Sequence, residues 1–140
     1  MKKIFLVLFL LFSISLYAFP QDRFLIKITN TLETDCKLKD DIILFGHVSD
    51  YTHIPAVIHP HTTEAFMMRS GPRYAGVHNA EKTVLLTYIC DSEQKITLFT
   101  NGNHYHRVDA KTFDVKNMSA SFEGSNPILD RSEIHWTLSY

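Results

Sequence analysis

The chain has 140 residues, of which 45% are hydrophobic, and its 14 Lys and Arg against 15 Asp and Glu give a formal net charge of −1. This near-neutral balance, without a long run of one sign, gives no support for nucleic acid or an anionic membrane as an electrostatic partner. The composition also lacks long Gly, Pro or Ser linkers, so a single domain is expected.

Residues 1–18 have the pattern of a secretory signal peptide. Two lysines precede the apolar run Ile4–Phe12, and the small residue Ala18 stands at the expected cleavage site. The run is shorter than the roughly 20 residues that a membrane-spanning helix needs. We therefore expect one mature domain, residues 19–140, exported to the periplasm or the medium and without a transmembrane segment. The Lys-Lys start and the Phe- and Leu-rich leader are typical of bacterial export.

Removal of the leader changes the charge and leaves one pair of cysteines. Two lysines leave with it, so 12 Lys and Arg face 15 Asp and Glu and the net charge becomes −3. Cys36 and Cys90 remain, and an even pair in an exported domain predicts a disulfide. Closing a loop of roughly 55 residues would stabilise the fold by about 3–4 kcal/mol.

Period-two alternation dominates the mature sequence, which predicts strands rather than helices. The segment Asp109–Lys116 is ambiguous between a short helix and an irregular excursion. Eight or nine short antiparallel strands with frequent turn signals predict an all-β fold, a single β-sandwich rather than a mixed architecture. Phe24, Phe66, Phe122 and Trp136 occupy alternating apolar positions and are expected in the core. Besides a hairpin around residues 101 and 102, the expected strands cover Phe24–Thr29, Ile42–Val48, Ile54–Ile58, Glu64–Arg69, Thr83–Cys90, Met118–Glu123 and Glu133–Ser139.

Asn101-Gly102 stands between two alternating runs, which predicts a hairpin with a type I′ turn. In the expected register Thr100 pairs with Asn103, and Phe99 pairs with His104. One face of this hairpin then points to the core and carries Ile96, Leu98 and Tyr105. The opposite face carries Thr97, Phe99, His104 and His106.

Two histidine pairs have a spacing that suits a metal ion. His59 and His61 are separated by one residue, as are His104 and His106, and i and i+2 side chains of a strand project from the same face. Glu64 could add an oxygen ligand to the first pair. These five residues are the candidate ligands for a divalent metal, in a structural site or with a metal-activated water. The alternative is that they are ordinary surface histidines.

The segment from His59 to Gly71 resembles part of a cupin metal motif. In that motif an HxH pair precedes a Glu and a Gly, which correspond to His59, His61, Glu64 and Gly71. The resemblance implies a metal-binding protein or a metalloenzyme on an all-β scaffold.

A second resemblance covers most of the mature chain. It rests on the order of an opening strand ending in Asn (FLIKITN), a Gly-containing strand (ILFGHV), an Ile-Pro/His-Pro segment (IPAVIHPHTTEAF), a turn with Gly76, and the strands TVLLTY and KITLFTNGN. This layout is similar to that of the aegerolysin and actinoporin-like sandwiches. The resemblance implies a protein that binds membrane lipid and, in some cases, assembles pores with a partner.

Three aromatic residues outside the expected core are candidate ligand-binding residues: Phe99 beside His104 and His106, Tyr51 in a polar loop, and Tyr74 near two glycines. Apart from the histidine pairs, the sequence carries no catalytic signature, since it contains no GxSxG elbow, HExxH, P-loop or GxGxxG motif. We therefore expect an exported, non-enzymatic binding module whose ligand is a membrane lipid, a glycan or a host protein. The alternatives are the metal-dependent protein described above and a structural or inhibitory envelope component.

Overall fold

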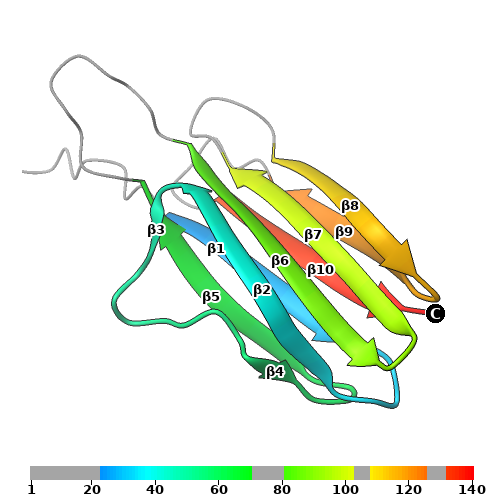
Figure 1. The fold of residues 1–140 in the computed structure, drawn as a ribbon. Coiled ribbons are helices and arrows are strands. Elements are labelled where there is room, and N and C mark those ends of the chain that lie inside the picture. Colours follow the sequence, from blue (N-terminus) through cyan, green and yellow to red (C-terminus); the bar gives the residue numbers. More distant parts are fainter. Residues whose placement is uncertain (1–22, 71–80, 103–107, 126–131) are drawn as a thin grey trace, which may run out of the picture.

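The computed structural model describes residues 23–70, 81–102, 108–125 and 132–140, and all regular structure in these ranges is β-strand (Figure 1). The leader, Tyr74, His104 and His106 lie outside the described residues. Among the described residues, no helix has the length and apolar character needed to cross a membrane.

Ten strands form two five-stranded sheets that pack face to face (Figure 1). Sheet A has the order β3 (His47–Val48), β5 (Thr63–Arg69), β1 (Arg23–Asn30), β10 (Ser132–Ser139) and β9 (Ser119–Ser125). Sheet B has the order β4 (Val57–Ile58), β2 (Cys36–Phe45), β6 (Lys82–Asp91), β7 (Gln94–Gly102) and β8 (Asp109–Lys116). β1 and β10 pair in parallel and the other described pairs are antiparallel. The predicted all-β sandwich is confirmed.

Three strand predictions need correction. The expected strand Ile42–Val48 is divided at Gly46, where a φ of 82° lets the chain leave β2 in sheet B and enter β3 in sheet A. A Cβ at Gly46 would lie 2.5 Å from the carbonyl oxygen of Arg69, so only glycine fits this crossover. The expected strand Ile54–Ile58 shortens to β4. The ambiguous segment Asp109–Lys116 is neither a helix nor irregular, because it pairs with β7 as an edge strand.

The predicted turn at Asn101-Gly102 is wrong. Both residues belong to β7, where Thr100 pairs with Ala110 and Asn101 with Asp109. Neither has the positive φ that a type I′ turn requires. Gly102 is needed for a different reason, since a Cβ there would lie 2.7 Å from the ring of Phe24 in sheet A.

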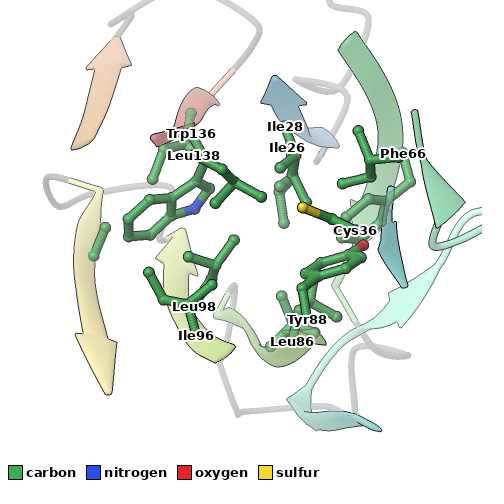
Figure 2. Close-up of a cluster of buried hydrophobic side chains, with 14 of the residues drawn as sticks. Ile26, Ile28, Cys36, Phe66, Leu86, Tyr88, Ile96, Leu98, Trp136 and Leu138 are labelled. Carbon is green, nitrogen blue, oxygen red and sulfur yellow. The ribbon is translucent and has the colours of Figure 1, made fainter. Parts of the chain in front are cut away.

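The core fills the space between the two sheets (Figure 2). Phe24, Phe66 and Trp136 are fully buried, as the sequence predicted, and Ile96 and Leu98 of β7 also face inward. The prediction for Phe122 is wrong, because this side chain is 44% exposed. Its ring packs on Trp136 with 5.1 Å between centroids, but β9 is an edge strand, so solvent reaches the ring from the open side.

Two hydrogen bonds involve polar side chains in or beside the core. The indole N–H of Trp136 in sheet A donates to the hydroxyl oxygen of Thr100 in sheet B at 2.9 Å. The Tyr88 hydroxyl donates to the carbonyl oxygen of Pro55 at 2.9 Å. Burial, followed by the charges of Asp41 and Glu64, raises the pKa of Tyr88 well above its usual value, so the hydroxyl stays a neutral donor.

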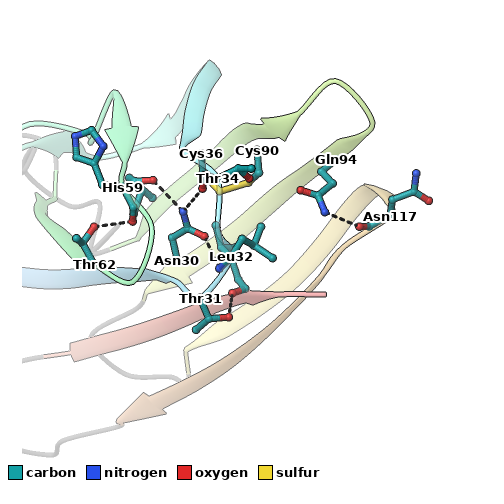
Figure 3. Close-up of a disulfide and its surroundings, with 12 residues drawn as sticks. Asn30, Thr31, Leu32, Thr34, Cys36, His59, Thr62, Cys90, Gln94 and Asn117 are labelled. Atoms are coloured by element: carbon teal, nitrogen blue, oxygen red, sulfur yellow. Dashed lines mark hydrogen bonds between the residues drawn. A yellow bond between two sulfur atoms is a disulfide. The ribbon is translucent and has the colours of Figure 1, made fainter.

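Asn30 at the end of β1 satisfies all of its hydrogen-bonding groups although it is fully buried (Figure 3). Its side-chain amide donates to the carbonyl oxygens of Thr34 and Ile58, and its side-chain oxygen accepts from the Leu32 N–H. Its backbone N–H donates to the carbonyl oxygen of Thr62, and its carbonyl oxygen accepts from the His61 N–H, both in the β4–β5 turn. This single residue therefore connects sheet A with β4 of sheet B.

The predicted disulfide is confirmed. Cys36 of β2 and Cys90 of β6 are bonded and buried (Figure 3). The bridge lies within sheet B and joins two neighbouring strands at the end where β4 covers the edge of β2. It holds β2 against β6 and indicates an oxidising compartment.

The disulfide generates a test of stability. Reduction should lower the free energy of unfolding by about 3–4 kcal/mol, because the bridge closes a loop with a sequence separation of 54 residues. Cys36→Ser and Cys90→Ser should be equally destabilised in urea titrations. A wild-type protein whose melting temperature does not change with a reductant would contradict this.

The packing of Gly102 generates a second test. Gly102→Ala should destabilise the fold by about 1–3 kcal/mol, because the added methyl group overlaps the Phe24 ring. Adding Phe24→Leu should recover part of that loss by making room, and a double-mutant cycle measures the coupling. If Gly102 were needed for a type I′ turn, Gly102→Asn should be tolerated. A stable Asn variant would therefore argue against the packing explanation.

The Asn30 contacts generate a third test. Asn30→Asp replaces two N–H donors with an acceptor that faces the carbonyl oxygens of Thr34 and Ile58. We expect a loss of about 2–4 kcal/mol in chemical denaturation, because buried polar groups lose their partners. The exposed Asn117→Asp serves as the control for the same chemical change, and an equal effect in both variants would contradict the role of Asn30.

Candidate functional site

The predicted histidine site does not form from its described members. His59 and His61 lie in the turn between β4 and β5 rather than in a strand, and His61 has a φ of 57°. The Nδ1 atom of His59 is 2.8 Å from Asp35, whereas the Nε2 atom of His61 is 3.1 Å from Glu33. The two imidazoles thus bind separate carboxylates of the β1–β2 loop.

Glu64 does not join these histidines. It lies in β5 opposite Ile28, and none of the described residues forms a group of three or more His, Cys, Asp or Glu side chains that could hold a metal ion. His59, His61 and Glu64 thus do not come together as a ligand set in the described part of the chain, and a metal site stays a prediction. His104 and His106 lie outside the described ranges, so the second pair is not placed.

Of the three candidate aromatic residues, two are described. Tyr51 lies in the β3–β4 loop and is 92% exposed. This loop and the inner side of β2 border a shallow groove of about 350 Å³ that contains Asp41, Asp50 and His53. Phe99 lies in β7 on the side of sheet B that faces away from the core, as predicted. Its neighbour is Phe113 of β8, with ring centroids 6.2 Å apart in an edge-to-face arrangement.

Phe99 and Phe113 belong to an apolar row that crosses the outer face of sheet B. Ile42 pairs with Leu85, and Leu85 pairs with Phe99, so these three side chains stand on one rung of the sheet. Phe113 adds a ring on the next rung, opposite Thr97. Ile42 and Phe113 are 47% and 48% exposed, and Leu85 and Phe99 are half-buried. We call these four residues the apolar row.

The apolar row continues into an exposed sheet edge. Ile43, Leu44 and Phe45 at the end of β2 are each at least 39% exposed. β4 pairs only with Cys36 and Lys37, so within the described strands the rest of β2 lies at an uncovered edge of sheet B. In Figure 1 this part of β2 runs beside β6 towards the upper end of the sandwich. Exposed aliphatic side chains on a free edge are uncommon in soluble domains.

Lysines accompany the apolar row on the same face. Another rung carries Lys37, Ile89, Lys95 and Lys116, whereas Lys111 stands opposite Phe99 at the end of the apolar rung. Lys95 forms an ion pair with Asp114. Lys37, Lys111 and Lys116 make no ion pair with a residue in the described part of the chain. The outer face of sheet B therefore carries both large apolar side chains and lysines without an ion-pair partner among the described residues.

The outer face of sheet A has a different chemistry. One rung across four strands carries Thr63, Thr29, Thr137 and Ser121, and an adjacent pair is Ser119 and Ser139. Thr29 and Thr63 hydrogen-bond to each other at 2.6 Å, and so do Ser119 and Ser139 at 2.9 Å. The two faces thus differ among the described residues: the outer face of sheet B combines large apolar side chains with lysines that form no ion pair there, whereas Lys27 of sheet A is paired with Glu133.

Sequence reasoning identified Phe99 but missed its partners. A turn at Asn101-Gly102 predicts His104 and His106 as the neighbours of Phe99. A longer β7 moves the return strand to Asp109–Lys116 and brings Phe113 and Lys111 beside Phe99. The sequence did contain one signal of an apolar outer face, because β6 has apolar residues at outward as well as inward positions.

No protein-family model matches the chain, and no curated protein matches its sequence. Among solved structures the chain is similar to the lipid binding protein Nakanori, with 11% sequence identity, 84% of this chain and 71% of that chain covered, and a TM-score of 0.66. It is also similar to IP-1A from Alcaligenes faecalis, with 10% identity, coverage of 85% and 91%, and a TM-score of 0.51. At these identities the likeness concerns the fold alone.

Proposed function

We propose that the mature chain is an exported, non-enzymatic module that binds lipid through the outer face of sheet B. The observation that carries the proposal is the apolar row Ile42, Leu85, Phe99 and Phe113, which stands in water on a face that is not needed for the core. Large side chains exposed together on a sheet face are typical of interaction sites. The likeness of the fold to a lipid binding protein supports lipid as the ligand class.

Other features agree with export and with binding rather than catalysis. The leader-like residues 1–18 and the Cys36–Cys90 bridge both fit an oxidising compartment. The resemblance of the strand order to aegerolysin and actinoporin-like sandwiches points to the same ligand class. The row extends over four neighbouring strands on the outside of a sheet, which suits contact with a lipid surface.

Binding should depend on Phe113. We expect the mature protein to sediment with phosphatidylcholine-based vesicles and Phe113→Ser to reduce the apparent affinity about tenfold, because burying this half-exposed ring contributes ~1.5 kcal/mol. Tyr140→Ser removes an aromatic residue that is more exposed, 73% against 48%, and that lies away from sheet B, so this variant should bind as the wild type does. Thermal melts establish that both variants are folded.

Three outcomes would contradict the proposal. A wild-type protein that stays in the supernatant with every vesicle would remove lipid binding as the function. Vesicle binding that survives Phe113→Ser but falls with Tyr51→Ser would place the contact on the β3–β4 loop instead. Release of hydrolysed lipid during the assay would show an enzyme rather than a binding module.

A further inference from the structure

We propose that the outer face of sheet B recognises an anionic phospholipid surface, with Lys37, Lys111 and Lys116 contacting lipid phosphates. This inference rests on the lipid-binding function proposed above and specifies the class of lipid. The chain as a whole gives no hint of it, because its net charge is slightly negative. Lys37 lies in β2, whereas Lys111 and Lys116 lie in β8, and these strands come to share one face only through the register of sheet B.

The register places these ammonium groups across the full width of the face. Lys37 pairs with Ile89, Ile89 pairs with Lys95, and Lys95 pairs with Lys116, so the rung spans β2, β6, β7 and β8. Neighbouring strands are roughly 4.8 Å apart, which separates the outer two lysines by about 14 Å at their Cα atoms. That span exceeds the size of one phosphate group, so the arrangement suits several lipid headgroups rather than a single bound anion.

Two of the three lysines, Lys111 and Lys37, lie beside apolar side chains. Lys111 stands opposite Phe99 and is followed two residues later by Phe113 on the same face. Lys37 is directly opposite Ile89. A lysine stem can lie along apolar surface while its ammonium group reaches the headgroup level, so this mixture matches the boundary between acyl chains and phosphates. A soluble polyanion would leave the apolar row in water.

The acidic groups near this face form no ion pair with these three lysines in the described part of the chain. Asp114 is already bound to Lys95. Asp40 stands on the rung of Thr87 and Thr97, and Asp109 is paired with Asn101 at the start of β8, so neither shares a rung with a free lysine. Asp35 and Asp91 line a shallow pocket together with Lys37, and neither forms an ion pair with it, so all three ammonium groups are left to contact lipid phosphates.

The test compares two variants of equal net charge on two kinds of vesicle. The first, Lys37→Gln/Lys111→Gln/Lys116→Gln, removes the three lysines from sheet B. The matched control, Arg23→Gln/Lys27→Gln/Arg69→Gln, removes three cations from the strands β1 and β5 of sheet A. The vesicles contain phosphatidylcholine alone or phosphatidylcholine with phosphatidylglycerol, and sedimentation gives the partition constant for each.

We expect the wild type to prefer vesicles with phosphatidylglycerol and to lose this preference at high salt. The sheet B variant should bind those vesicles on the order of a hundredfold less tightly, since each lysine near an anionic surface contributes about fivefold. The sheet A control should bind as the wild type does, and thermal melts should be similar for both.

The failure of this inference is distinguishable from that of the proposed function. Equal binding to both vesicles by the wild type would overturn the anionic specificity while leaving lipid binding intact. An equal loss in both variants would show that net charge, not this face, is responsible. Absence of binding to either vesicle would overturn the lipid-binding function itself, and retention on heparin alone would indicate a soluble polyanion in place of a membrane.

Discussion

Two sheets that share one core leave each strand with an inward side and a solvent side, and this constraint decides which apolar residues are available for binding. The side chains at the inward positions of β6 and β7, such as Val84, Leu86 and Leu98, are buried in the core. Leu85 and Phe99 on the same strands face away from the core. Because they contribute nothing to the packing between the sheets, they are available for a contact outside the domain.

The buried contacts keep this surface flat and in place. The hydrogen bond from Trp136 to Thr100 fixes the two sheets against each other directly beneath the outer face of β7. The Cys36–Cys90 bridge fastens the beginning of β2 to β6. β4 covers only two residues of β2, so the position of Ile42 beside Leu85 depends on this bridge and on the β2–β6 ladder. The elements that stabilise the fold therefore also align the candidate site.

The candidate site was predictable in part. Strand alternation placed Phe99 on the solvent side, and that placement is correct. Its partners could not be found in the same way, because the Asn-Gly pair is a strong local turn signal that the tertiary structure overrides. Gly102 continues β7 opposite Lys82 and lies against Phe24 of the other sheet, so the return strand starts later and a different set of side chains reaches Phe99. The histidines illustrate the same limit, since His59 and His61 find carboxylates on a loop distant in sequence.

The amino-acid sequence by itself determined the all-β class, the pairing of its two cysteines and the burial of Phe24, Phe66 and Trp136. These properties follow from local alternation and from the simple arithmetic of one cysteine pair. Only the tertiary structure decided the crossover at Gly46, the exposure of Phe122 and the assembly of the apolar row with its lysines. Each of these depends on which strands become neighbours and in what register, and that choice is made by packing between segments far apart in the chain.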